Sequence, residues 1–212
     1  VTPLYLAVNK NNIEIINFLL SQPGVKISPD SFTGCKKLTQ ISIPSTMTFI
    51  GDSAFAGCSS LSEIEIPSSI TTIGDYAFSE CSSLLQIIIP SSVTSIGKGA
   101  FKGCSLITEI KINSSIKLIE VHTFNKCTSL KQIVFEGKSI IASIGSYAFG
   151  SCKSLNQMFI PSSVKSIDSF AFSECSTLNE IVFESPSSVT KIGEKAFNEC
   201  ISLSQISIPS NV

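Results

Sequence analysis

Eight cysteines and one histidine are the side chains in this chain best suited to chemistry. Thiols can hold metal ions or pair as disulfides, and an imidazole can act as a base or as a metal ligand. His122, however, has no carboxylate or thiol at metal-ligand spacing around it. The serines have no nearby base to activate them, and the glycines form no phosphate-binding loop. We therefore expect no enzymatic activity, no cofactor and no metal site.

The cysteines mark a repeat. Successive cysteines are 23 residues apart five times and 25 residues apart twice: Cys35, Cys58, Cys81, Cys104, Cys127, Cys152, Cys175 and Cys200. A phenylalanine stands three positions before each cysteine, from Phe32 to Phe197, and a leucine or isoleucine stands three positions after. A fixed period of this length is typical of a solenoid, in which each repeat is one coil.

The regular spacing argues against a disulfide framework, whose spacings are irregular because its bridges join distant loops. In a solenoid every cysteine occupies the same point of its coil. Coils about 4.8 Å apart would bring neighbouring Cα atoms within bridging range, but parallel side chains give a poor disulfide dihedral. We therefore expect a column of buried free thiols that pack as small apolar groups.

Each coil is expected to contain two extended segments. Residues six and eight positions after the cysteine, such as Ile64 and Ile66, are apolar in every repeat. Their alternation predicts a strand with one face inward, ended by a proline in most coils. Val93 and Ile96 predict a second short strand or an extended turn on the same coil.

The rest of the coil is expected to be turns and loops. Gly97 would permit a bend into a helical turn over 98–104. The two 25-residue spacings each add two residues after the first strand, within 135–145 and 183–193. Loops tolerate such insertions best.

The phrase at 89–105, IPSSVTSIGKGAFKGCS, recurs along the chain and closely resembles the BspA-like, or treponemal-type, leucine-rich repeat. The resemblance covers residues 27–212, although Glu120 and Asp168 replace the usual glycine in two coils. It implies a right-handed leucine-rich-repeat solenoid of about eight coils of 23–25 residues. A parallel β-sheet would form one face, and short strands and helical turns the other. Members of the family are commonly surface proteins that adhere to host cells and to extracellular-matrix proteins.

Residues 1–26 differ from the repeat. The stretch TPLYLAVNKNNIEIINFLL resembles a single ankyrin repeat, although Tyr5 stands where histidine is usual. It predicts an ankyrin-type helix pair that acts as a partial repeat or as an N-terminal cap. The chain begins at Val1 and ends on ISIPSNV without a polar cap, so we expect it to be part of a longer protein.

Composition excludes some partners. With 15 basic and 16 acidic residues the net charge is −1, which gives no reason to expect nucleic acid. No apolar run approaches the ~20 residues of a membrane-spanning helix, so we expect no direct membrane insertion. The final strand is uncapped, and an exposed edge of this kind can lead to self-association.

A protein ligand has two candidate surfaces. Residues five, seven and nine positions after each cysteine are expected to project from the sheet, and the seventh position supplies the candidates Ile88, Lys111, Val134, Phe159 and Val182. These residues could instead only stabilise neighbouring strands. The rival surface lies five positions before the cysteine, with Tyr76, His122, Tyr147 and Phe170. Its rings could instead pack on neighbouring coils.

Three functions are consistent with these features. The first is a surface adhesin or antigen, secreted or at the cell surface, that binds host or matrix proteins. The second is an intracellular ankyrin and leucine-rich-repeat scaffold, since free thiols suit a reducing compartment. The third is a structural spacer without a dedicated ligand. On a secretory route, Asn113-Ser114-Ser115 would be the one glycosylation sequon.

Overall fold

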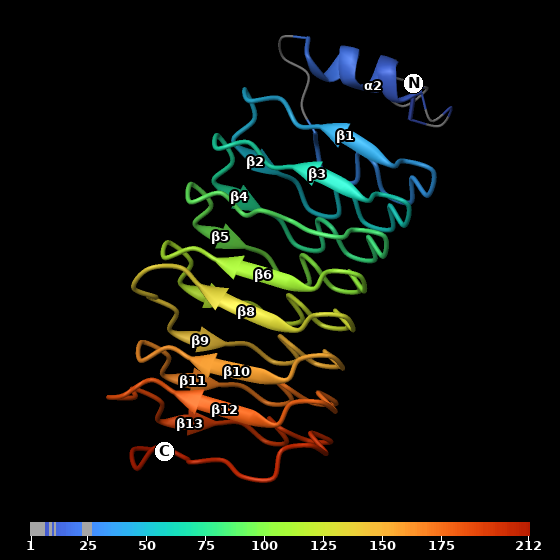
Figure 1. The fold of residues 1–212 in the computed structure, drawn as a ribbon. Coiled ribbons are helices and arrows are strands. Elements are labelled where there is room, and N and C mark those ends of the chain that lie inside the picture. Colours follow the sequence, from blue (N-terminus) through green and yellow to red (C-terminus); the bar gives the residue numbers. More distant parts are fainter. Residues whose placement is uncertain (1–6, 9, 11, 23–26) are drawn as a thin grey trace.

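A computed structural model describes residues 7–8, 10, 12–22 and 27–212 of the chain. From residue 27 onward the chain winds into a parallel β-solenoid in which each coil stacks on the one before (Figure 1). The eight phenylalanines of the repeat stack above one another and mark about seven full turns. The repeat solenoid predicted from the spacing is confirmed.

The first strand of each coil lies on one side of the solenoid. These strands are β1 (Gln40–Ser42), β3 (Glu63–Glu65), β6 (Glu109–Ile112), β8 (Gln132–Phe135), β10 (Gln157–Ile160) and β12 (Glu180–Phe183). They pair in parallel as β1–β3, β6–β8 and β10–β12, each residue facing its equivalent one coil later. Residues 86–89 run between β3 and β6 outside the paired strands. The predicted parallel sheet is therefore present as three strand pairs.

A second set of strands, two residues each, forms separate parallel sheets. One sheet contains β2 (Phe49–Ile50), β4 (Thr72–Ile73) and β5 (Ser95–Ile96). The other contains β7 (Leu118–Ile119), β9 (Ser143–Ile144), β11 (Ser166–Ile167) and β13 (Lys191–Ile192). The second short strand predicted in each coil is confirmed.

The segment between the second strand and the cysteine was expected to be a helical turn, and it is not. Residues three apart are bonded, as from Cys58 N–H to Phe55 O at 3.1 Å. However, the residues five and one before the cysteine have left-handed backbone, with φ of 55° at Tyr76 and 59° at Glu80. A left-handed residue ends a helical turn. Alternate N–H groups bond to the next coil instead, as from Phe55 to Ala77 O at 2.8 Å.

Gly97 is explained by close approach between coils and not by a bend. A Cβ added there would lie 2.5 Å from the backbone nitrogen of Asp75, one coil earlier. The backbone of Gly97 is not left-handed, and neither is that of Glu120 or Asp168 at the equivalent position. The expectation that Gly97 serves to permit a bend was therefore wrong.

The phenylalanines and cysteines form two columns in the core. Successive phenylalanine rings lie 5.2–5.6 Å apart, centroid to centroid. From Cys58 to Cys200, each thiol donates a hydrogen bond to the phenylalanine carbonyl one coil earlier, with Sγ–O distances of 3.1–3.3 Å. All eight cysteines are free thiols and all but Cys35 are buried, as predicted. The thiols therefore serve as hydrogen-bond donors as well as apolar filling.

Helix α2 (Ile13–Leu20) covers the first coil. Asn12 caps it by accepting a hydrogen bond from Ile15 N–H at 3.0 Å, and Ile16 and Leu20 are buried in the common core. Asn17 Oδ1 accepts a bond from Ser42 N–H at 3.2 Å, which fixes the helix to β1. Residues 1–6, 9, 11 and 23–26 lie outside the described part, so the ankyrin-type helix pair stays a prediction.

Asn113 replaces proline in its coil and is only 4% exposed. Its amide donates to Pro90 O at 2.9 Å and to Val93 O at 3.2 Å, and its Oδ1 accepts from Ser115 N–H at 2.8 Å. The sequon predicted here is thus closed within the folded coil, where a glycosylating enzyme has no access to the amide.

The buried thiols should make the solenoid sensitive to alkali. Burial raises the pKa of Cys81 and of Cys127 from the ordinary value of 9.0 to about 12. A pKa raised on folding stabilises the folded state below the unfolded pKa, and this contribution is lost as the pH rises through the folded pKa. The free energy of unfolding should therefore fall as the pH rises from about 9 to about 12, because the unfolded chain then releases thiol protons that the folded chain retains.

Urea unfolding at stepped pH measures this effect, and the double variant Cys81→Ala, Cys127→Ala should show a shallower fall. Thiol titration supplies the control: all eight thiols should react in the denatured, unreduced protein, and in the folded protein all but Cys35 should react only slowly. A free energy of unfolding that stays constant over this pH range would contradict the prediction.

Gly97→Ala should destabilise the solenoid by about 2–3 kcal/mol, because the added methyl overlaps the preceding coil. Gly34→Ala is the comparison: its φ is +71°, but an added Cβ there meets nothing within 4 Å. That variant should lose only about 1 kcal/mol, the cost of a left-handed alanine. Chemical denaturation of both variants checks the order, and an equal or smaller loss at Gly97 would disprove the close-approach explanation.

Candidate functional site

Residues five and seven positions after each cysteine form one outward surface, which we call the strand face. The residues between them point into the core, as the predicted alternation requires. The seventh-position residues are Ser42, Glu65, Ile88, Lys111, Val134, Phe159, Val182 and Ser207; all are exposed except Val182, which is half-buried. The candidates on this face are therefore accessible, and their role in binding stays a prediction.

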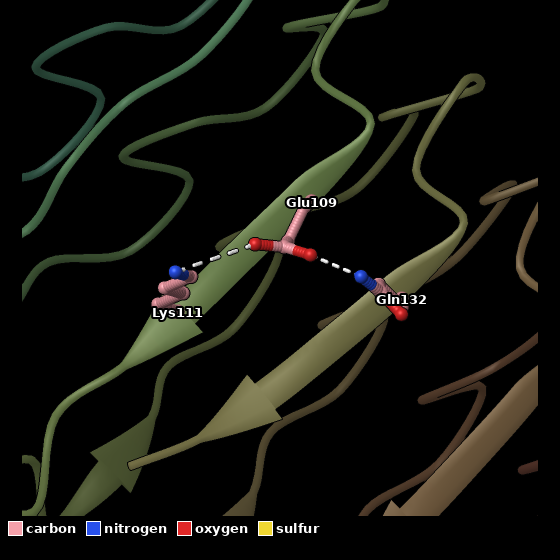
Figure 2. Close-up of polar contacts among 3 residues, drawn as sticks. All are labelled: Glu109, Lys111 and Gln132. Carbon is pink, nitrogen blue, oxygen red and sulfur yellow. Dashed lines mark hydrogen bonds and ion pairs between the residues drawn. The ribbon is translucent and has the colours of Figure 1, made fainter.

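Polar side chains link neighbouring strands across the strand face (Figure 2). Lys111 Nζ lies 3.8 Å from Glu109 Oε1, and the Gln132 amide, one coil later, donates to Glu109 Oε2. In the same way Gln157 Nε2 donates to Glu180 Oε2 at 2.6 Å. Exposed pairs of this kind contribute at most about 1 kcal/mol each. They do, however, leave Glu109 and Lys111 partly neutralised.

An apolar stripe occupies the C-terminal half of the strand face. Val134 on β8 is 36% exposed and Phe159 on β10 is 41% exposed. Phe159 faces Val182 in the register of β10 and β12, and β8 lies beside β10 (Figure 1). The three side chains therefore lie on neighbouring strands of one face, with Phe159 directly opposite Val182.

Two hollows lie in the N-terminal half of the strand face. They have volumes of about 470 Å³ and 670 Å³ and share the side chains of Glu63, Gln86 and Ile88. The first extends to Asn17 of α2, and the second extends to Glu136 beyond β8. The hollows flank residues 86–89, the segment that lies outside the paired strands.

The rival candidates form a column at one corner, which we call the corner column. The rings of His122 and Tyr147 lie 5.1 Å apart, and those of Tyr147 and Phe170 lie 4.8 Å apart. Lys195 Nζ continues the column, 5.7 Å from the Phe170 ring centroid. Tyr76 lies apart from these rings, against the next coil at Gly99. The rings thus pack on neighbouring coils, which was the alternative to a binding role.

His122 has none of the contacts that a catalytic or ligating imidazole needs. Its Nδ1 is buried without a hydrogen-bond partner. Burial, followed by the positive charge of Lys102, lowers the pKa of the ring and so favours its neutral form. Within residues 7–8, 10, 12–22 and 27–212, no group of three His, Cys, Asp or Glu side chains is placed to hold a metal ion.

In the same described residues, no helix has the length and apolar content to cross a membrane.

Two features of these surfaces were missed from the sequence. The hollows are lined in part by residues 86–89, a segment outside the paired strands, and the repeat pattern contains no signal for this interruption. The left-handed backbone in the turn did have a signal, since Gly34, Gly57 and Gly103 stand just before the cysteine in three coils.

The comparisons agree with the coil geometry. A model of the BspA type leucine rich repeat region matches residues 25–142 and 128–212. The structure of a leucine-rich repeat protein of T. pallidum is 28% identical with a TM-score of 0.59, covering 86% of this chain and 73% of that one. No curated protein matches the chain.

Two further solved structures share the fold. A leucine-rich repeat protein of Eubacterium ventriosum is 19% identical with a TM-score of 0.60, covering 90% of this chain and 78% of that one. A leucine rich cell surface protein of Faecalibacterium prausnitzii is 24% identical with a TM-score of 0.52, covering 87% and 71%. Because the family model matches nearly all of the solenoid, the chain belongs to the BspA-type leucine-rich repeat family.

Proposed function

We propose that this chain is a surface adhesin or antigen that binds host or extracellular-matrix proteins through its strand face. Repeats of this family are typically non-enzymatic protein-interaction modules. The proposed location at the cell surface draws support from the F. prausnitzii structure, which is that of a cell surface protein.

The observation that carries the proposal is the apolar stripe of Val134, Phe159 and Val182. Rigid neighbouring strands present these side chains to solvent, so little conformational entropy is lost when a partner covers them. Aromatic residues at the centre of an interface often dominate its affinity. The corner column is a weaker candidate because its rings already stack on one another.

The free thiols favour the intracellular scaffold less than their number suggests. All but Cys35 are buried, and burial raises the pKa of residues such as Cys127, so little reactive thiolate forms at neutral pH. Such thiols can persist in either compartment. The hypothesis of an intracellular scaffold therefore rests on the ankyrin-like segment alone. Most of the first half of that segment lies outside the described residues.

Changing the apolar stripe should abolish partner binding without unfolding the chain. Val134 and Phe159 lie outside the core, so the variant Val134→Ser, Phe159→Ser should keep the far-ultraviolet dichroism and cooperative unfolding of the native chain, with a lower melting midpoint because part of each side chain is covered. Loss of an aromatic hot spot costs about 2 kcal/mol or more, or about thirtyfold in affinity. Surface plasmon resonance against a panel of purified matrix proteins measures this loss.

Leu118→Ser is the matched control, because Leu118 is similarly exposed on β7, outside the strand face. Its affinity for the same matrix protein should equal that of the native chain. Undiminished binding by the Val134 and Phe159 variant would show that the apolar stripe is not the site.

Antibody labelling of intact source cells tests the location. An adhesin should be labelled without permeabilisation. Labelling that appears only after permeabilisation would reject the surface role and support the cytoplasmic scaffold. An antibody against a cytoplasmic protein of the same cells controls for leakage.

A further inference from the structure

We infer that the two hollows beside Ile88 bind a positively charged segment of the partner that carries an apolar side chain. This inference rests on the proposed function, since it names the chemistry of the partner at the strand face. The apolar stripe of Val134, Phe159 and Val182 would lie in the same footprint, further along the solenoid.

Charge is concentrated at the hollows. Four carboxylates line them, from Glu63, Glu65, Glu109 and Glu136, against the single ammonium group of Lys111. Lys111 is already paired with Glu109. Among the residues that the structure describes, Glu63, Glu65 and Glu136 have no ion-pair partner. The whole chain carries a net charge of only −1, so this excess is local and complements a cationic partner.

An apolar anchor stands between the carboxylates. Ile88 is 74% exposed, far more than Val134 or Phe159, and it lies on the border shared by the two hollows. Its neighbours Ile87 and Ile89 are buried and hold it in place. A partner side chain in either hollow would cover Ile88, while flanking lysines or arginines would reach the carboxylates.

A bound metal ion does not explain the same residues. The carboxylates are spread over several coils, and no three of them come together as a ligand set within the described residues. Phosphate-rich partners are also disfavoured, because their charge has the same sign as that of the hollows. An extended or helical peptide segment with spaced positive charges satisfies both the distribution of charge and the exposed isoleucine.

The test uses three labelled peptides of about eight residues, comparable to one strand and its flanks. The first alternates lysine and leucine, the second replaces lysine by glutamate, and the third replaces leucine by serine. Fluorescence anisotropy with the whole chain should show binding of the lysine–leucine peptide that weakens as salt is added. The other two peptides should bind at least about tenfold more weakly.

Variants of the chain locate the site. Ile88→Ser should lower the affinity for the lysine–leucine peptide about tenfold. The double variant Glu63→Gln, Glu65→Gln should lower this affinity about fivefold, and its binding should depend less on salt than that of the native chain. Glu199→Gln, at an exposed carboxylate outside the hollows, is the matched control and should bind as the native chain does. All these changes are at exposed side chains, and circular dichroism verifies that each variant is folded.

Three results would overturn the inference. The glutamate–leucine or lysine–serine peptide could bind as tightly as the lysine–leucine peptide, or the Ile88 and glutamate variants could bind it undiminished. Alternatively, sedimentation could show a dimer that these same variants abolish, which would assign the hollows to a second copy of the chain.

The peptide measurements decide the inference, whereas binding to matrix proteins decides the proposed function. If a matrix protein binds the Ile88→Ser variant as tightly as the native chain but fails to bind the Val134 and Phe159 variant, only the inference fails. If no matrix protein binds the native chain, the proposed function fails by itself.

Discussion

The solenoid depends on the stacking of equivalent residues in successive coils, and from Cys58 to Cys200 each thiol contributes to it by donating a hydrogen bond to the phenylalanine carbonyl one coil earlier. The same carbonyl accepts the backbone N–H of the cysteine in its own coil, so thiol and backbone together satisfy it. A carbonyl at this depth would otherwise be left with little compensation for its lost hydration. The thiol bond acts together with backbone bonds between coils, such as that from Phe55 N–H to Ala77 O at 2.8 Å, along the direction in which the phenylalanine rings stack 5.2–5.6 Å apart.

The period carries most of the information about the fold. Because the coils stack in a single register, equivalent residues must form columns, and the buried thiols, the two strands and the outward fifth and seventh positions all follow from that. The period does not show why a particular residue type occupies its position. Gly97 and a bend-forming glycine look the same in sequence, and only the preceding coil shows that space is the cause. The left-handed turns are signalled only in part, since glycine stands at Gly99 and Gly103 in one coil, whereas Tyr76 and Glu80 hold the equivalent left-handed positions in the coil before it.

The candidate site could be predicted only where it follows from the stacking of equivalent residues in successive coils. Ile88, Val134 and Phe159 are exposed because strand residues alternate, and this needs no knowledge of neighbours. The hollows, in contrast, are lined by residues from several coils together with the unpaired segment 86–89. Such a shape depends on differences between coils, whereas a repeat pattern describes what the coils share.

The division between shared and variable positions also explains how so uniform a scaffold can be selective. The sixth and eighth positions are confined to apolar residues by the core, but the seventh position runs through serine, glutamate, isoleucine, lysine, valine and phenylalanine. A substitution there changes the strand face without disturbing the columns beneath it, because its side chain points away from them. The thiol and phenylalanine columns hold these variable residues in fixed positions, so little conformational entropy is lost when a partner binds them. Selectivity for a partner can therefore change one coil at a time while the stability of the solenoid stays constant.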